Sequence, residues 1–417
     1  MAPYTEKSPK KNIVILGGSY GGMSVAHYVL KHAIPKLPEH DTYQVILVSI
    51  GTEAMCRPAC PRAMISDDFF PQEKLFVNIP KQFEQYPKGR FRFVQGTASH
   101  LDQTNRIVSV KLAKSDTTET SDFHALVIAT GASTPSPLIG SNGDQELLKS
   151  SWKQFRDALP TAKHIVIAGG GPTGVEAAGE LGEHLNGRAW FFSQKLEDPA
   201  VKITLLTSGS KLLPVLRPAI AQKAEKLLAQ AGVTVVKNAP VQDVTPSATG
   251  KEGIAGPVTV NLKDGRAIDT DLYIPAFGTT PNTSFVDKAL LASDGRVDTN
   301  TATLRVDKAG PRIYAIGDAS TYARAAVHHI LNAVPVLGAN IKRDLLLEAG
   351  QDVAGVDREF KEEKREMQMV PIGKSKGVGA VFGWQLPSFM VWLIKGRDYF
   401  LWTTGPLWSG THWAKES

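Results

Sequence analysis

The spacing of apolar residues along the chain predicts short buried strands that alternate with helices. Residues 12–16, Asn-Ile-Val-Ile-Leu, form a largely β-branched run that leads directly into a glycine-rich turn. Apolar residues between 23 and 30 then recur at the spacing of one helix face, and a second apolar run follows at 44–48. This order predicts a βαβ unit whose first turn is rich in glycine.

The same pattern recurs in the middle of the chain. Residues 164–168 read as a strand, 169–174 as a glycine-rich turn, 175–185 as a helix and 201–206 as the next strand. The interval between the two copies is far too long for a solenoid repeat. It favours two nucleotide-binding domains in one chain.

Glycine in these turns has a physical purpose. The first glycine permits the tight turn, the next lets the backbone approach a pyrophosphate, and the last lets the helix pack closely on the strand. The pyrophosphate then meets free N–H groups at the start of the helix. The alternative is a pair of ordinary glycine-rich turns. The candidate cofactor-binding residues are Gly17, Gly18, Ser19, Tyr20, Gly21 and Gly22 in the first copy, which has Ser19 at the middle glycine position, and Gly169, Gly171 and Gly174 in the second.

Neither unit has an acidic residue at the end of its second strand, where a carboxylate usually binds a ribose hydroxyl. Ser49 and Thr207 stand at these places, and Glu53 comes a few residues late in the first unit. In the second unit, the missing carboxylate leaves no negative charge to repel the 2′-phosphate of NADPH, and Lys211 is near. We therefore expect NADPH to be accepted as well as NADH, unless Lys211 is simply a solvated lysine.

Further strand ends make the pattern more specific. One strand ends in Ala129-Thr130-Gly131, another in Gly317-Asp318, and a turn at Gly278 precedes Pro281-Asn282. In this order with the two glycine turns, the chain resembles the flavoprotein reductases with two dinucleotide domains. The tail, with Gly-Lys-Ser-Lys-Gly at 373–377 and Lys-Gly-Arg-Asp at 395–398, is similar to the AMID-like branch. Its members are related to apoptosis-inducing factor and include ferroptosis suppressor protein.

The resemblance implies an α/β fold with two Rossmann-like domains and a small α+β C-terminal domain. The FAD-binding domain would comprise residues 11–149 and 270–345, the NAD(P)H-binding domain 150–269, and a C-terminal cap 346–417. FAD would lie at the first turn and NAD(P)H, the electron donor, at the second. Asp318 would bind the ribityl or phosphate part of the flavin. The implied activity is an FAD-dependent NAD(P)H oxidoreductase that reduces a quinone or another small acceptor.

Glu176 is the candidate catalytic residue, because related reductases place a glutamate beside the nicotinamide at this point. Glutamate is also favoured at a helix start for its charge alone. His328 and His329 would lie near the start of a later helix, where they could relay a proton or be ordinary helical histidines.

Cys56 and Cys60 raise an alternative reading, because some flavoprotein reductases carry a redox disulfide in this region. Three residues separate the two cysteines here, where those enzymes have four, and Pro58 interrupts the segment. A disulfide reductase therefore stays open as an alternative. Arg57 and Arg62 are candidates for contact with the FAD phosphates.

The C-terminal segment is rich in tryptophan. Five of the seven tryptophans lie here, at positions 384, 392, 402, 408 and 413, with apolar residues between them and Lys395 and Arg397 beside them. Tryptophan with basic flanks is typical of a membrane interface, which would bring the protein to a lipid quinone. The alternatives are a packed cap over the flavin and a dimer contact.

The amino-acid composition excludes several classes of protein and of ligand. Hydrophobic residues make up 42% and charged residues 21% of the 417 residues, which excludes a disordered chain. Two cysteines exclude a disulfide scaffold and a four-cysteine zinc site, and we expect no metal. The net charge of +6 favours anionic ligands, but without a dense basic arm we expect no specific nucleic acid. A redox-sensing, apoptosis-related flavoprotein that binds DNA or a protein partner is the competing hypothesis.

The start of the chain shows no targeting signal. Residues 1–11 are polar, and Ala2 excludes an N-myristoylation site. No run approaches 18 apolar residues. We expect a cytoplasmic protein, either free or peripheral to a membrane.

Overall fold

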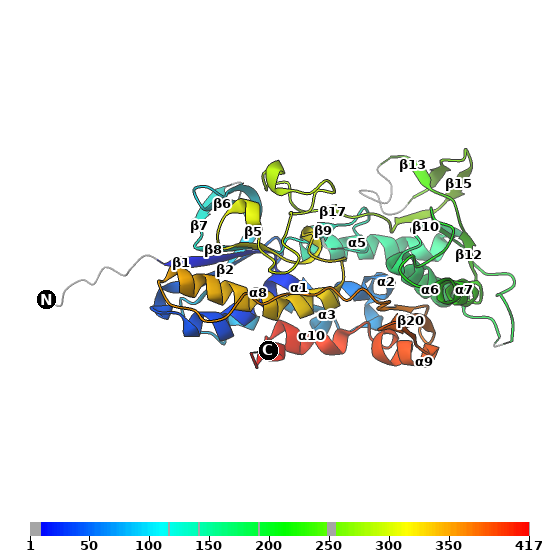
Figure 1. The fold of residues 1–417 in the computed structure, drawn as a ribbon. Coiled ribbons are helices and arrows are strands. Elements are labelled where there is room, and N and C mark those ends of the chain that lie inside the picture. Colours follow the sequence, from blue (N-terminus) through cyan, green and yellow to red (C-terminus); the bar gives the residue numbers. More distant parts are fainter. Residues whose placement is uncertain (1–9, 116, 141, 191, 248–255, 417) are drawn as a thin grey trace.

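The computed structural model describes residues 10–115, 117–140, 142–190, 192–247 and 256–416. Two sheets with parallel strands dominate it, one at each end of the molecule, and the C-terminal helices lie below both in Figure 1. The predicted α/β class with two Rossmann-like units is confirmed. The helices are α1 (Tyr20–Tyr28), α2 (Cys60–Ala63), α3 (Gln72–Leu75), α4 (Ile79–Phe83), α5 (Gln145–Ala158), α6 (Pro172–Asn186), α7 (Pro218–Ala229), α8 (Val327–Glu348), α9 (Ser388–Val391) and α10 (Leu401–Trp408).

The first sheet has seven strands in the order β18-β8-β1-β2-β5-β6-β7. Their bounds are Ile313–Ala315, Ala125–Ile128, Lys11–Leu16, Tyr43–Ser49, Phe91–Asp102, Ile107–Leu112 and Thr118–Asp122 in that order. The five strands from β18 to β5 are parallel, whereas β5, β6 and β7 form an antiparallel meander. Residues 13–16 of β1 are fully buried on both faces, as expected of a central strand covered by helices. Because β18 joins β8, the sheet is assembled from two stretches of chain.

The second sheet is built from the segment between those two stretches. Four parallel strands take the order β12-β11-β10-β16. Their bounds are Val233–Val236, Lys202–Leu206, His164–Ala168 and Leu272–Pro275. Helix α6 begins at Pro172, earlier than the sequence predicts. Proline is well suited to the first helical turn, because the N–H groups there have no acceptor within the helix and proline has no N–H.

Smaller sheets complete the fold. An antiparallel sheet contains β13 (Val241–Thr245), β14 (Val258–Leu262) and β15 (Ala267–Thr270), and another contains β19 (Gln368–Pro371), β20 (Gly377–Val381) and β21 (Trp384–Gln385). The strand pairs are β3 (Glu53–Met55) with β4 (Phe76–Asn78) and β9 (Ala132–Ser133) with β17 (Thr280–Pro281).

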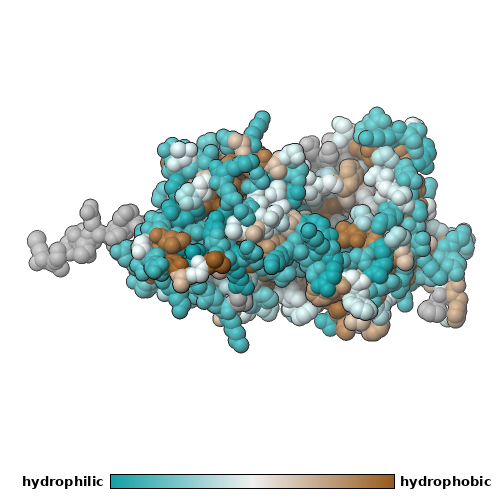
Figure 2. Space-filling model, viewed as in Figure 1, coloured by the Kyte–Doolittle hydropathy of each residue, from teal (hydrophilic) through white to brown (hydrophobic). Residues whose placement is uncertain are grey.

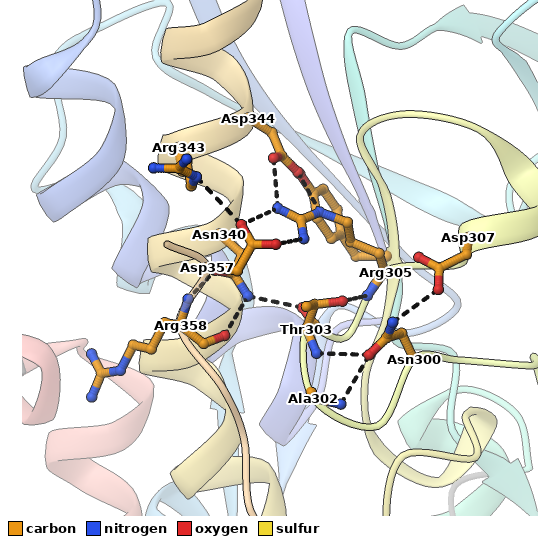
Figure 3. Close-up of polar contacts among 11 residues, drawn as sticks. Asn300, Ala302, Thr303, Arg305, Asp307, Asn340, Arg343, Asp344, Asp357 and Arg358 are labelled. Atoms are coloured by element: carbon orange, nitrogen blue, oxygen red, sulfur yellow. Dashed lines mark hydrogen bonds and ion pairs between the residues drawn. The ribbon is translucent and has the colours of Figure 1, made fainter. Parts of the chain in front are cut away.

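The connector between α8 and the C-terminal segment is held against the first unit by partly buried polar contacts (Figure 3). The Asp357 carboxylate accepts two bonds from Arg305, at 2.6 and 2.9 Å, and Arg305 also binds Asp344. The Asn340 side chain forms two 2.9 Å hydrogen bonds with the backbone of Arg358. These contacts fix the path by which the chain reaches its C-terminal segment.

The backbone carbonyls of the C-terminal segment anchor it to helix α1 and to the π-helical turn Val29–Ala33 that continues α1. Ring nitrogens of His27 and His32 lie 2.8 and 2.7 Å from the carbonyl oxygens of Trp408 and Trp413. Burial lowers the pKa of His27 to about 4, so this contact is made by a neutral imidazole. Across the described part of the chain, no helix combines the length and apolarity needed to cross a bilayer.

Candidate active site

A cavity of about 900 Å³ receives residues from both glycine-rich units and from the C-terminal segment. Thirteen of the seventeen candidate catalytic and cofactor-binding residues line it. They are Gly17, Gly18, Ser19, Tyr20, Gly21, Arg57, Ala129, Thr130, Gly131, Glu176, Gly278, Gly317 and Asp318. Gly22, Gly169, Gly171 and Gly174 are not among its described lining residues.

The first glycine turn brings the backbone closer than a side chain would allow. Gly17 has a φ of +123°, and a Cβ there would lie 2.1 Å from the carbonyl oxygen of Ala129. A Cβ on Gly22 would lie 1.7 Å from the oxygen of Gly17, so Gly22 serves helix–strand packing. Ser19 has an extended φ of −121°. The middle position therefore needs no glycine here, which explains the departure from the glycine pattern.

The second turn repeats this geometry. Gly169 has a φ of +135°, and a Cβ there would lie 2.2 Å from the oxygen of Ala276. A Cβ on Gly174 would lie 1.9 Å from the oxygen of Gly169. Among the described residues, no atom lies within 4 Å of the place a Cβ on Gly171 would take. That open side of the helix start is where a pyrophosphate can approach the N–H groups.

Asn282 joins the two stretches of chain that connect the first unit with the second. Its backbone N–H donates to Gly131 at 3.0 Å, and its side chain donates to the carbonyl of Thr130 at 3.0 Å. The Thr130 hydroxyl donates back to the Asn282 carbonyl at 2.7 Å. These bonds hold the predicted Ala-Thr-Gly segment and the Gly278 turn together in the cavity wall.

Asp318 and Arg57 lie together in the wall of the cavity. Asp318 follows β18 in the short turn that Gly317 opens with a φ of +79°. One carboxylate oxygen of Asp318 lies 3.7 Å from the Arg57 guanidinium, and both side chains are partly exposed. A carboxylate and a guanidinium side by side can bind hydroxyl and phosphate groups respectively.

Glu176 forms a buried ion pair with Lys395, which the sequence reading did not identify as a site residue. The Lys395 ammonium lies 2.5 Å from a Glu176 carboxylate oxygen, and both residues line the cavity. The residues are 9% and 3% exposed respectively. Burial raises the pKa of Glu176 to about 7, while Lys395 acts in the opposite direction. The pair can therefore hold and release a proton near neutral pH. Lys395 is the sole charged residue in the apolar run 389–396, and this isolated charge is the sequence feature that could have identified it as a site residue.

The expected contact between Arg62 and a flavin phosphate is wrong. Arg62 is buried behind the cavity and binds both carboxylate oxygens of Glu180, at 2.9 and 2.8 Å. The hydroxyl of Tyr399 donates to the same carboxylate at 2.9 Å. Glu176 and Glu180 are one helical turn apart on α6, so this helix faces the C-terminal segment with two paired carboxylates.

The remaining polar candidates are engaged elsewhere. The ammonium of Lys211 donates to the carbonyl of Leu216, and Glu53 lines the cavity but pairs with Lys149 at 3.0 Å. A ring nitrogen of His329 lies 2.8 Å from the Arg324 carbonyl. Neither His328 nor His329 belongs to the described cavity lining. Within the described ranges, no group of three or more His, Cys, Asp or Glu is placed to hold a metal ion.

The two cysteines lie buried as free thiols. Burial raises the pKa of the Cys56 thiol to about 11 and that of the Cys60 thiol to about 12. Since the thiolate is the reactive species, these environments disfavour a redox-active pair.

We expect a variant with both Cys56→Ala and Cys60→Ala to keep its turnover within about twofold of the parent, because neither thiol carries electrons. Turnover with a fixed acceptor, normalised to bound flavin, measures this. Loss of turnover with unchanged flavin content would instead favour the disulfide reductase reading.

The chain is similar to known proteins in both sequence and structure. The family model described as pyridine nucleotide-disulphide oxidoreductase matches residues 11–335. The chain is 60% identical to oxidoreductase phnG of Penicillium herquei, over the whole of both chains. It is 25% identical to human ferroptosis suppressor protein 1, with 94% of each chain covered. The structure of NDH2 from Plasmodium falciparum in complex with NADH superposes with a TM-score of 0.65 at 16% identity, over 98% of this chain and 99% of that one.

Proposed function

The chain belongs to the pyridine nucleotide-disulphide oxidoreductase family, with relatives in the AMID-like branch, and from this premise we propose that it is an FAD-dependent NAD(P)H oxidoreductase that reduces a quinone-type acceptor. The family pairs FAD with NAD(P)H as electron donor. One observation carries the proposal: the helix start of the second unit, with Pro172, Thr173 and Glu176, lines the same cavity as the first glycine turn. A nicotinamide bound to the second unit can therefore reach a flavin bound to the first.

The residues present fit FAD. Gly17 and Gly22 let the backbone approach closely, and Gly18, Ser19 and Gly21 line the cavity around the start of α1. Asp318 is available for a ribityl hydroxyl and Arg57 for a phosphate. When bound, FAD supplies the acceptor of hydride and the donor of electrons to the second substrate.

The chain itself supplies orientation, exclusion of water and a proton. Asn282 fixes the cavity wall, and the C-terminal segment covers the side where Lys395 enters. Reduction of a quinone to a quinol consumes protons as well as electrons. The Glu176–Lys395 pair, whose carboxyl has a pKa near 7, is suited to provide one as a general acid.

The test is turnover by the purified protein with NADH or NADPH and a short-chain quinone, followed at the nicotinamide absorbance band. The proposal expects acceptor-dependent oxidation of the nucleotide. Bound flavin without turnover on any quinone would contradict the quinone assignment and leave flavin binding intact.

The nucleotide preference gives a separate prediction. Strand β11 ends at Leu206, and the exposed Ser208 and Ser210 that follow it carry no charge. We therefore expect NADPH to be used at least as efficiently as NADH. The Ser208→Asp variant should lower kcat/KM for NADPH about 10- to 100-fold and spare NADH, because a carboxylate repels the 2′-phosphate.

The matched control is Ser150→Asp, an exposed serine on α5 outside the cavity lining. It should change neither value. A parent enzyme with a clearly higher kcat/KM for NADH than for NADPH would contradict this expectation.

A further inference from the structure

The helical segment 388–396 has its polarity reversed. It consists of α9 and the π-helical turn Trp392–Gly396 that continues it. Lys395 is buried on its inner side, whereas Phe389, Trp392 and Leu393 are 65%, 37% and 49% exposed. A surface helix normally buries its apolar stripe and exposes its charges. Here Val391 alone among the large apolar residues is fully buried, whereas Phe389, Trp392 and Leu393 face outward.

The apolar surface continues onto the next helix. Trp402 is 59% exposed, and its indole N–H lies 3.4 Å from the carbonyl of Ile394. We call Phe389, Trp392, Leu393 and Trp402 the outer aromatic face. Figure 2 shows brown and pale side chains at the lower edge of the molecule, where Figure 1 places α9. Trp408 and Trp413, by contrast, pack into the core beside α1, so the tryptophan-rich tail is divided between two roles.

We propose that the outer aromatic face inserts into the interfacial layer of an anionic lipid membrane. Phenylalanine and tryptophan are the residues that favour this layer. Basic residues flank the stripe at both ends. Lys376 lies near the start of the helical segment, because the N–H of the adjacent Gly377 donates to the Ser388 hydroxyl at 2.8 Å. At the other end of the segment, the Arg397 side chain is 52% exposed. Asp398 lies 4.0 Å from Arg397 and offsets part of that charge.

The charges favour lipid over a second copy of the chain. If the helix packed on its own copy across a twofold axis in antiparallel fashion, the Lys376 end would face the Arg397 end of the partner. Like charges would then meet at both ends of the interface. Anionic headgroups are complementary to both ends at once.

The position of Lys395 connects this surface to the cavity. Lys395 lies on the inner side of the same helical segment and contributes to the cavity wall. Membrane contact would therefore bring the cavity wall next to the bilayer, where a lipid-soluble acceptor is concentrated. This last step rests on the proposed function, whereas membrane binding itself does not.

The experiment is flotation of the full chain with phosphatidylcholine vesicles that contain or lack phosphatidylserine. We expect the parent to float with the phosphatidylserine vesicles. Leu393→Glu should reduce the bound fraction about tenfold or more. The matched control is Leu347→Glu, because Leu347 on α8 is 48% exposed, close to the 49% of Leu393. That variant should float like the parent, and unchanged thermal unfolding midpoints show that both variants are folded.

Three results would overturn the proposal: no flotation of the parent with either vesicle, equal flotation of the two variants, or a parent dimer that Leu393→Glu dissociates without any vesicle binding. The last would assign the face to a second copy. Because flotation requires no turnover, its failure leaves the proposed oxidoreductase activity standing, and inactivity with quinones leaves membrane binding standing.

Discussion

The Gly22→Ala variant should be purified with almost no flavin. The added Cβ would lie 1.7 Å from the carbonyl oxygen of Gly17, a backbone atom that cannot move without opening the glycine turn. Helix α1 must then shift away from β1, and both the phosphate cradle and the helix start are lost. Overpacking of this kind costs about 1–3 kcal/mol or more. The ratio of flavin to protein absorbance measures the effect.

Two matched glycine variants make this result specific. A Cβ on Gly174 would lie 1.9 Å from the oxygen of Gly169, so Gly174→Ala should retain flavin but lose its reduction by NAD(P)H. Gly405 in α10 has no described atom within 4 Å of its Cβ position, so Gly405→Ala should resemble the parent. A Gly22→Ala protein with full flavin content would contradict the assignment of the first turn to FAD.

The Lys395→Met variant should lower turnover with quinone about 100-fold or more while the nucleotide KM changes little. Methionine keeps the apolar stem of the side chain as far as Cε but leaves Glu176 buried without a cation. Breaking a buried ion pair in this way costs about 3–5 kcal/mol of stability. The double variant with Glu176→Gln should therefore recover stability but not turnover. Lys374→Met, at an exposed lysine between β19 and β20, is the control.

The pH dependence separates a proton donor from a structural residue. Turnover of the parent should fall as the pH rises through about 7, where Glu176 loses its proton, and Glu176→Gln should flatten this profile. Because the folded-state pKa lies above the ordinary value of 4.5, the native state holds the proton more tightly. The free energy of unfolding contributed by Glu176 therefore falls as the pH rises from about 4.5 to about 7. An unchanged profile in Glu176→Gln would remove Glu176 from the proton-transfer role.

The glycine turns and the strands around them were accessible from sequence because their information is local. A β-branched run, a glycine at a positive φ and a helix within the next residues specify one another, and Gly17 and Gly169 occupy the expected places. The placement of Asp318 beside the first turn was also expected, although β18 lies far along the chain. The resemblance, rather than periodicity, supplied that long-range pairing.

Contacts between distant segments could not be predicted in this way. Arg62 was expected at a phosphate, but Glu180 on the second unit neutralises it in the interior. Lys395 joins Glu176 across more than half of the chain, and nothing local to either residue specifies the other. The tryptophans of the tail have similar neighbours in sequence, yet Trp408 packs beside Tyr20 while Trp402 is exposed. Tertiary packing, which the local pattern does not encode, decides each of these cases.

The central claim is that a nicotinamide held by the second unit meets a flavin held by the first in the cavity beside Glu176. Its most direct test is the anaerobic visible spectrum of the purified chain before and after addition of NADPH or NADH. We predict a yellow protein with equimolar FAD whose flavin bands bleach upon addition of at least one nucleotide. A colourless protein that FAD cannot reconstitute, or a flavin that neither nucleotide reduces, would contradict it.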